Sequence, residues 1–323
     1  MSTTGAAVRR AIGIGALGAA AGLSWALLEA QAYTLRRVTA TVLPAGARDV
    51  RVLHISDLHL LPSQRRKVEW LRALADLRPD LVVNTGDNMA HRDSMPAVLE
   101  ALAPLLKVPG AFVMGSNDYY EPVRRNPARY LRDDPRNPDA PEAPPLPARA
   151  LGQAFSAAGW ADLTNTRAQV SAGGVTFSFV GVDDPHLERD RFPAAGSGAG
   201  GPRRSTAGEP VVRVGVTHAP YVRILDAMHA DGCSLILAGH THGGQLCVPG
   251  YGALVTNCDL DPGRASGLHG WPGVRPDVDG GASGSSWLHV SAGLGTSPFT
   301  PVRFACRPEA TLLTLTSARE PRS

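Results

Sequence analysis

The sequence lacks the features that mark most nucleic-acid-binding proteins. Lys67 and Lys107 are the only lysines among 32 basic residues, aromatic residues make up 6% of the chain, and the formal net charge is +3. Nucleic-acid-binding proteins use a concentrated basic stripe with interleaved aromatic side chains. No such stripe is present, so we expect no nucleic-acid partner and rank nucleic-acid cleavage below other activities.

Cysteine is also scarce. The four cysteines are Cys233, Cys247, Cys258 and Cys306. No two form a Cys-x-x-Cys pair, so no thiolate zinc knuckle or redox motif of that kind is present. Scattered cysteines are more typical of buried or free thiols than of a disulfide framework. One or two bridges remain open if the domain is exported.

The N-terminal segment differs from the rest of the chain. Arg9 and Arg10 precede an uncharged stretch of 18 residues, 11–28, which Glu29 ends. This length is at the short limit for a membrane-spanning helix and above that of a usual signal-peptide core. We therefore predict that residues 1–37 form a helical membrane anchor; a cleaved export signal and a soluble helix are the alternatives. Arginines flank both ends of this stretch, so the positive-inside rule does not decide on which side of the membrane the domain lies.

Residues 38–323 are predicted to form one layered α/β domain. Apolar runs that read as strands alternate with segments of helical spacing, which argues for packed sheets and helices. The expected strands are 50–55, 81–83, 110–114, 211–216, 234–237, 288–291 and 311–315, with a hairpin over 169–182. The expected helices are 65–77, 95–106, 151–158 and 221–229. Segments rich in proline or glycine predict insertions near 122–147, 193–208 and 263–286.

Five short polar motifs follow predicted strands in a fixed order. They are Asp57-Leu58-His59, Gly86-Asp87-Asn88, Ser116-Asn117-Asp118, Thr217-His218-Ala219 and Gly239-His240-Thr241-His242. In open α/β sheets, ligands bind outside the carboxyl ends of strands. We therefore expect these motifs to meet at one sheet edge, where Asp, Asn and His side chains suit hard or borderline metal ions.

The spacing within the motifs supports a metal site. Asp57 and His59 are two residues apart, so their side chains point the same way from an extended segment. A carboxylate such as that of Asp87 has two oxygens and is able to bridge two cations. Gly86 and Gly239 precede predicted ligands, where a residue without a side chain lets the backbone approach an ion or a phosphate closely.

Together these motifs resemble those of the calcineurin-like metallophosphoesterase family, over residues 50 to 245. The N-terminal segment is similar to that of its membrane-associated, YkuE-like bacterial branch. The resemblance implies a β-sandwich flanked by helices, with two metal ions (manganese, iron or zinc) at one edge. It implies that Asp87 binds both ions. The other implied ligands are Asp57, His59 and His242 for the first ion, and Asn117, His218 and His240 for the second.

One motif departs from the family pattern. The family reads Gly-Asn-His followed by Asp or Glu, whereas this chain reads Gly115-Ser116-Asn117-Asp118. One register places Ser116 at the Asn ligand and Asn117 at the catalytic His; the other places Asn117 at the ligand and Asp118 at the His. The ungapped alignment favours the first, but we prefer the second because Asn is the better metal ligand.

In that register Asp118 would protonate the leaving group. This role needs a pKa well above the ordinary value of about 3.9. His186 and the Tyr119-Tyr120 segment are the other candidate acids.

The resemblance predicts a hydrolase that cleaves a phosphoester with a metal-bridging hydroxide. With a membrane anchor, the expected substrate is a lipid-linked or envelope phosphoester. A phosphodiesterase acting on nucleotides is one alternative. A non-catalytic metal-binding scaffold of the same fold is the other, because the usual His is missing.

Overall fold

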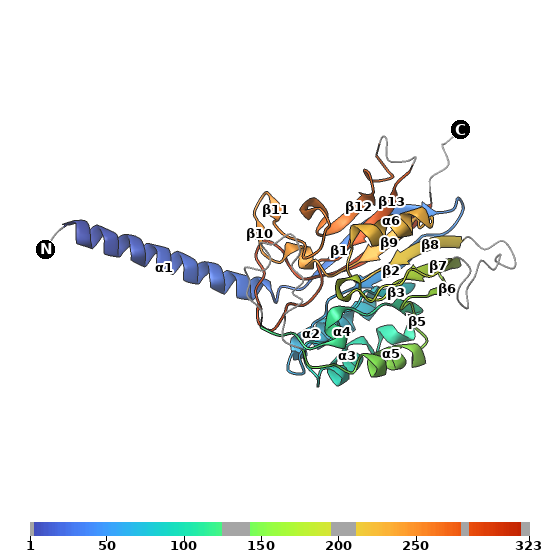
Figure 1. Ribbon diagram of the computed structural model, residues 1–323, viewed down its shortest axis with the longest axis horizontal. Helices are drawn as coiled ribbons and strands as arrows, with labels where there is room; N and C mark the ends of the chain where they lie inside the picture. Colours follow the sequence, from blue (N-terminus) through green and yellow to red (C-terminus); the bar gives the residue numbers. More distant parts are fainter. Residues whose placement is uncertain (1–2, 125–142, 195–210, 279–283, 318–323) are drawn as a thin grey trace.

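The computed structural model describes residues 3–124, 143–194, 211–278 and 284–317, and within them two six-stranded sheets face each other (Figure 1). The first sheet has the order β1 (Thr34–Leu43), β14 (Glu309–Ser317), β2 (Val50–Ile55), β3 (Leu81–Asn84), β4 (Gly110–Phe112) and β5 (Ala161–Asp162). The second has the order β12 (Gly267–Trp271), β13 (Ser286–Val290), β9 (Leu235–Ala238), β8 (Val211–Val216), β7 (Val175–Gly181) and β6 (Arg167–Ala172).

The strands at the centre of each sheet run parallel. β2, β3 and β4 are parallel in the first sheet, and β7, β8, β9 and β13 are parallel in the second. β3 and β9 are buried along their whole length, as expected for strands covered on both faces. Because their carboxyl ends share one edge of the sandwich, the loops that follow them converge there.

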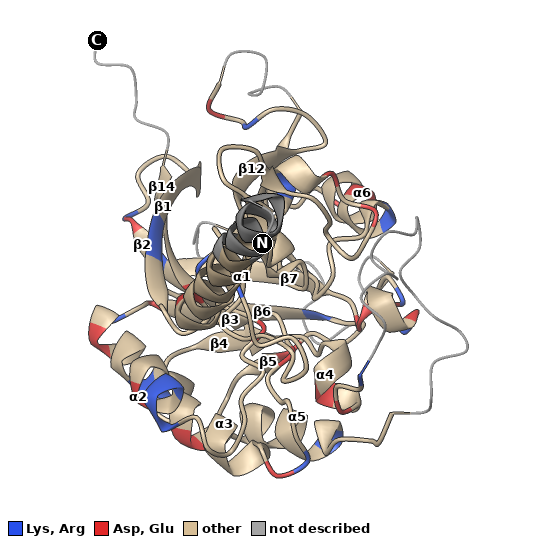
Figure 2. Ribbon diagram, turned by 90° about the vertical axis from the view of Figure 1, so that its left-hand side faces the viewer, with Lys and Arg blue, Asp and Glu red and all other residues tan. Residues whose placement is uncertain are grey.

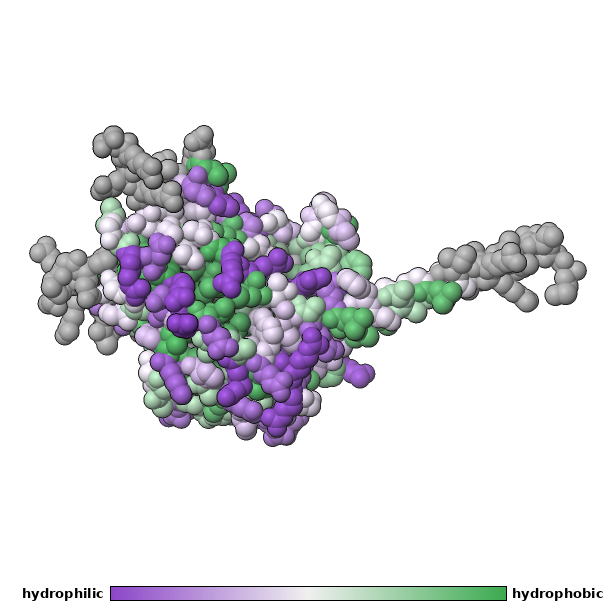
Figure 3. Space-filling model, turned by 180° about the vertical axis from the view of Figure 1, so that it is seen from behind, coloured by the Kyte–Doolittle hydropathy of each residue, from purple (hydrophilic) through white to green (hydrophobic). Residues whose placement is uncertain are grey.

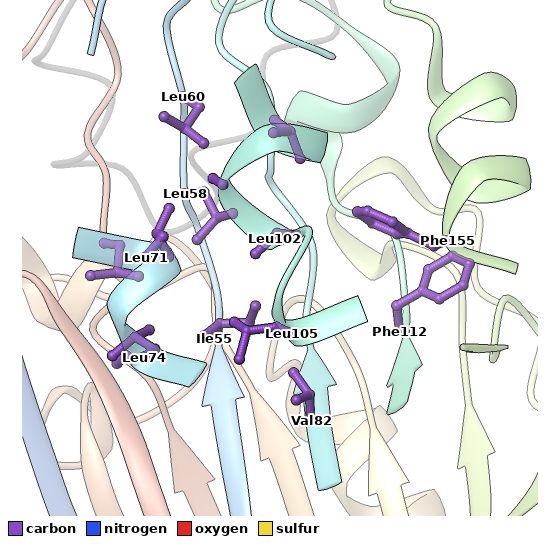
Figure 4. Packing of buried hydrophobic residues seen from close by; sticks show 14 of the residues in the cluster. Ile55, Leu58, Leu60, Leu71, Leu74, Val82, Leu102, Leu105, Phe112 and Phe155 are labelled. Carbon is purple, nitrogen blue, oxygen red and sulfur yellow. The ribbon is translucent and has the colours of Figure 1, made fainter. Parts of the chain in front are cut away.

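Helices cover the outer face of each sheet. α2 (Arg65–Ala73), α3 (Met95–Leu102) and α5 (Ala148–Ala157) lie over the first sheet, and α6 (Val222–Ala230) covers the second (Figure 1). Figure 4 shows the apolar side chains beneath the first group of helices, among them Leu71, Leu102 and Phe155 against Ile55 and Phe112. Complete burial of one such side chain contributes roughly 1.5–3 kcal/mol.

A second apolar core fills the space between the two sheets. Val52 and Val83 from the first sheet belong to one buried cluster with Phe177, Val214 and Leu237 from the second. The sandwich is therefore held by cores on both sides of the first sheet, and the strand ends that carry the polar motifs are fixed by packing from both directions.

Most predicted elements are present, with shifts at their ends. The hairpin is formed by β6 and β7, and its glycines Gly173 and Gly174 both have positive φ (64° and 78°), which suits the tight turn of a hairpin. The predicted helices 65–77 and 95–106 end in separate 3-10 turns, η1 (Leu74–Leu77) and η2 (Leu105–Lys107).

One predicted loop is partly wrong. The segment 263–286 contains β12, which pairs antiparallel with β13 over five residues. Its glycines suggested an irregular loop, but pairing with a buried neighbour overrides that local preference. The other two predicted insertions, 122–147 and 193–208, fall mostly outside the described residues.

The N-terminal segment forms a helix that projects from the domain. α1 (Thr3–Glu29) is 27 residues long and leaves the sandwich beside β10 (Cys247–Val248) and β11 (Gly252–Ala253) (Figure 1). Within the described part of the chain, no helix combines the length and the apolar character that a membrane crossing requires, so the predicted membrane span is not supported. The predicted boundary at residue 37 also lies inside β1, which pairs with β14 from Thr34 onward.

Candidate metal centre

Six of the seven predicted metal ligands meet at the carboxyl edge of the two sheets. Each lies in the loop directly after β2, β3, β8 or β9. Donor atoms of five of them form two groups, in each of which all atoms lie within 4.8 Å of one another. The first group is Asp57, His59 and His242, and the second is Asp57, Asp87 and His218.

Short distances between donor atoms connect the two groups. The Nε2 atoms of His59 and His242 are 3.2 Å apart, and the Nδ1 atom of His240 lies 3.3 Å from Nε2 of His218. One carboxylate oxygen of Asp87 lies 3.5 Å from Nε2 of His59 and 3.5 Å from Nε2 of His218. Asp87 therefore stands between the two sets of histidines.

The outward-facing nitrogens of three histidines have backbone partners. His218 Nδ1 lies 2.7 Å from the carbonyl oxygen of Thr85, His240 Nε2 lies 3.1 Å from that of Asn257, and His242 Nδ1 lies 3.2 Å from that of Gly295. An N–H at each of these atoms donates to the carbonyl, which leaves the other ring nitrogen facing the cluster. Metal-binding histidines are oriented in this way, so the donor set fits a metal ion with nitrogen and oxygen ligands.

Burial and neighbouring charges set the protonation states that ligands need. Burial would raise the pKa of Asp87, but His218 and His59 hold it well below its ordinary value. Burial lowers the pKa of His240 to about 4 and that of His242 to about 3. Near neutral pH Asp87 is thus an ionised carboxylate and His240 and His242 are neutral imidazoles, the forms that bind metal ions. Burial would lower the pKa of His218, but Asp87 raises it well above its ordinary value, so a metal ion would displace a proton from that ring.

The backbone at the cluster is bent unusually. Asp57, His59, Asp87, His240 and His242 all have φ between 38° and 70°. Residues other than glycine adopt this left-handed region rarely, and such strain concentrates at functional sites. The sharp bends turn the side chains inward immediately after the strands end.

Two predicted glycines are required for close packing at the cluster. Gly86 has φ of 94°, and a Cβ there would overlap the backbone of Gly115. A Cβ at Gly239 would overlap the Ser56 hydroxyl and lie 2.6 Å from a carboxylate oxygen of Asp57. Any larger residue at either position would push the ligand loops apart.

Asp118 is turned away from the cluster, which contradicts its predicted role as the leaving-group acid. Its carboxylate is completely buried and accepts hydrogen bonds from the backbone N–H groups of Asp87 (2.8 Å), Asn88 (2.9 Å) and Gly115 (3.0 Å). The side-chain amide of Asn88 donates to it as well, at 3.2 Å. Burial and the charge of Asp87 raise the pKa of Asp118 to about 6, but its oxygens are occupied in bracing the Asp87 loop.

Asn117 contacts the cluster through its backbone. Its N–H donates to Asp87 at 2.6 Å, whereas its side-chain amide donates to the carbonyl of Tyr120 at 3.0 Å. These contacts do not support the predicted ligand role of Asn117. Because Asp118 braces the Asp87 loop, it fits the acidic residue that ends the family motif. This favours the ungapped register, in which Asn117 aligns with the family's histidine and Ser116 with its Asn.

Arg303 is a site residue that the sequence did not indicate. It is completely buried, and Nη2 donates to the carbonyls of Ala292 and Gly295, both at 2.7 Å, and approaches His242 Nδ1 at 3.3 Å. Its Nη1 donates to the carbonyl of His242 at 3.2 Å. The guanidinium thus holds together the loops that carry His242 and support Asp57. No local pattern around residue 303 signals this role.

His186 lies at the rim of the cluster. Its ring packs on that of His240 with centroids 4.6 Å apart, and its Nδ1 lies 3.1 Å from the hydroxyl oxygen of Tyr221. The neighbouring Asp184 is completely buried, and burial is the main cause that raises its pKa to about 7. The loop after β7 therefore adds polar groups beside the second set of histidines.

Comparisons with known proteins agree with this arrangement. The family model described as calcineurin-like phosphoesterase matches residues 50–244. A protein of Aquifex aeolicus named "uncharacterized metallophosphoesterase" is 25% identical over 93% of this chain and 96% of its own. The metallophosphoesterase YkuE of Bacillus subtilis is 23% identical over 95% and 94%. The phosphodiesterase YaeI of Escherichia coli is 25% identical over 84% and 83%.

Proposed function

Because this chain belongs to the calcineurin-like phosphoesterase family of metal-dependent hydrolases, we propose that it hydrolyses a phosphoester with two metal ions bound at the sheet edge. The observation that carries the proposal is the convergence of six nitrogen and oxygen donors from four strand-end loops. The oxygen and nitrogen donors suit manganese, iron or zinc.

The positions of the donors suggest how the ions would be shared. Asp57, His59 and His242 would hold one ion, and His218 and His240 the other. Asp87 lies between them, 3.5 Å from a histidine of each set. When bound, such ions supply a nucleophilic hydroxide at neutral pH and neutralise charge on the phosphoryl oxygens.

In the ungapped register the leaving group has no acid at the usual position, because Asn117 occupies it. His186 is the best-placed substitute in the described part of the chain, since its ring packs on His240 and its Nδ1 is held by Tyr221. We therefore expect the protein to favour esters with good leaving groups. Replacing His186 by Asn should lower turnover most for esters with poor leaving groups and leave metal content unchanged.

We also propose that the protein associates with membranes and acts on a lipid-linked phosphoester. The described side chains of α1 include exposed Leu23 (57%), Trp25 (53%) and Leu28 (68%). Figure 3 shows apolar surface where this helix leaves the domain. Figure 2 shows basic and acidic residues interspersed on the face viewed along α1. We therefore expect the exposed apolar side chains of α1, and not a basic surface, to bind the membrane.

Deletion of residues 1–29 tests membrane association while leaving β1 intact. The full chain should sediment with phospholipid vesicles and the truncated chain should stay in the supernatant. Sedimentation of both forms to the same extent would contradict a role for α1.

Turnover assays on manganese-loaded protein test the hydrolase proposal. We expect hydrolysis of p-nitrophenyl phosphate, of its bis-ester, or of both, and loss of activity in Asp87→Asn. The relative named as a phosphodiesterase supports including the diester. Stoichiometric metal binding with no turnover of either compound would favour the non-catalytic scaffold.

A further inference from the structure

Two of the four thiols meet beneath the metal centre. Cys247 begins β10, and Cys306 lies 59 residues further along the chain. Backbone hydrogen bonds hold their segments side by side: the Cys247 N–H donates to the carbonyl of Phe304 (2.9 Å), and the Phe304 N–H donates to that of Gln245 (3.0 Å). The two sulfurs are therefore kept near each other by the fold and not by sequence proximity.

Both sulfurs contact the loop that carries the ligand His242. The Cys247 thiol donates to the carbonyl of Gly243 at 3.1 Å. The Cys306 sulfur lies 3.5 Å from the same oxygen and 3.3 Å from the carbonyl oxygen of His242. Cys306 also packs against the small buried cluster that contains Cys247. A Cβ at Gly243 would lie 2.7 Å from the Cys306 sulfur. The absence of a side chain at this position therefore lets the sulfur pack against the loop.

We propose that Cys247 and Cys306 form a reversible disulfide that controls metal binding through His242. A disulfide requires the sulfurs to approach to about 2.05 Å. Forming it removes both S–H groups and pulls the sulfurs from the carbonyls of His242 and Gly243. The loop then loses its supports on this side, and the His242 ring moves relative to Asp57 and His59.

The reaction needs a two-electron oxidant, for which we name a peroxide. The Cys306 sulfur attacks one peroxide oxygen, which gives a sulfenic acid and releases the other oxygen as water. The Cys247 sulfur then attacks the sulfenic sulfur, which forms the disulfide and releases a second water. Two thiols and one hydrogen peroxide thus become one disulfide and two waters. Cys306 is only partly buried, so a small peroxide has access to it.

The other two cysteines provide matched controls. Cys233 is buried in the apolar cluster under α6, and Cys258 packs against the same cluster. Neither contacts the loop of His242 among the described hydrogen bonds. Their replacement by serine should leave the response to peroxide unchanged.

The first experiment tests the pairing alone. Zinc-loaded protein is treated with hydrogen peroxide, free thiols are alkylated, and peptides are mapped by mass spectrometry without reduction. We expect a Cys247–Cys306 linked peptide that disappears on addition of dithiothreitol. If both thiols stay free after this treatment, or if either is linked to a different cysteine, the proposal is wrong, whatever the protein hydrolyses.

The second experiment tests control of the site, and this part rests on the proposed metal function. Zinc affinity is measured by competition with a chromogenic chelator before and after oxidation. Changes around metal-binding residues typically weaken affinity 10- to 100-fold, and we expect a loss in about that range that dithiothreitol reverses. Cys306→Ser and Cys247→Ala should keep their affinity after peroxide.

An equal loss of affinity in these variants would show that peroxide acts elsewhere and would reject the switch. Unchanged affinity in oxidised wild type with a mapped disulfide would reject it as well. A protein that binds no zinc before oxidation would instead contradict the proposed metal function, which keeps the two failures distinguishable.

Discussion

The loops after β3 and β4 leave neighbouring parallel strands, and each carries a buried aspartate that is used differently. Asp87 points into the cluster, where one oxygen lies 3.5 Å from His59 and from His218. Asp118 points back and accepts backbone N–H groups from its own loop and from the Asp87 loop. One carboxylate is available to a metal ion, and the other fixes the first in place.

This difference shows that residue type and strand-end position do not define a ligand. Both aspartates follow a strand, both are buried, and a glycine precedes each of them, Gly86 by one residue and Gly115 by three. What separates them is the direction of the side chain, which depends on where unpaired N–H groups lie. Because buried N–H groups need acceptors, the turn at Gly115 and the turn at Asp87 both recruit Asp118.

The largest expected effect is on Asp87. Asp87→Asn removes the charge between the two sets of histidines, so we expect loss of at least half of the bound metal. Phosphoester hydrolysis should fall on the order of 1000-fold, since metal ions contribute several kcal/mol to such reactions. Metal analysis and kinetics on the purified variant check this. Asp93→Asn, at an exposed position, is the control, and full occupancy in Asp87→Asn would refute the bridging position.

A smaller effect, on stability, is expected for Asp118. Asp118→Asn replaces an acceptor by an NH2 group that faces backbone donors, and a buried group left without its partner costs about 1–3 kcal/mol, more when it is charged. We expect the free energy of unfolding, measured in urea without metal, to fall by about 2–4 kcal/mol. Unaltered stability, with activity lost only on poor leaving groups, would restore the acid role for Asp118.

Acidification should destabilise the fold through two buried histidines of the sandwich, His54 and His289. His54 and His289 have their Nδ1 atoms 2.9 Å apart, and burial lowers the pKa of His54 well below its ordinary value and that of His289 to about 3. Lowered folded pKa values mean that stability is complete above the unfolded value of about 6.5 and is lost as the pH falls below it.

A drop from pH 7 to pH 5 should therefore lower the free energy of unfolding by about 2 kcal/mol for each of these two histidines. Urea titrations at both pH values check this. The loss of stability on acidification should be smaller in the double variant His54→Asn and His289→Asn than in the wild type. A variant whose stability falls as steeply as that of the wild type would contradict the assignment.

The smallest expected effect is a gain at Asn117. In the ungapped register, Asn117→His places an imidazole where the family carries its catalytic histidine, so it should raise turnover of phenyl phosphate on the order of 10-fold, below the full range for general acids. Activity on p-nitrophenyl phosphate should change less, because that leaving group needs little protonation. The comparison is made with Asn117→Gln; an equal response of both substrates would count against the ungapped register.

Much of the sandwich was predictable because its strands are short apolar runs bounded by polar motifs. β2, β8 and the β6–β7 hairpin match the predicted positions closely. β12 was missed because its glycines resemble a loop, and β1 because it directly follows an apolar helix. Both are edge strands of their sheets, where pairing with one neighbour decides the conformation more than local propensity does.

The sequence alone determined which residues lie at the carboxyl edge, because parallel strands place the loops after them on one side. It therefore predicted Asp57, His59, Asp87, His218, His240 and His242 as a group. Only the tertiary structure decided which way Asp118 and Asn117 turn, because that depends on N–H groups contributed by a different strand-end loop. It also decided the roles of Arg303, Cys247 and Cys306, whose partners lie in loops that only folding brings together. Chain order sets the direction of a strand, but hydrogen-bond partners from other segments set the direction of a side chain.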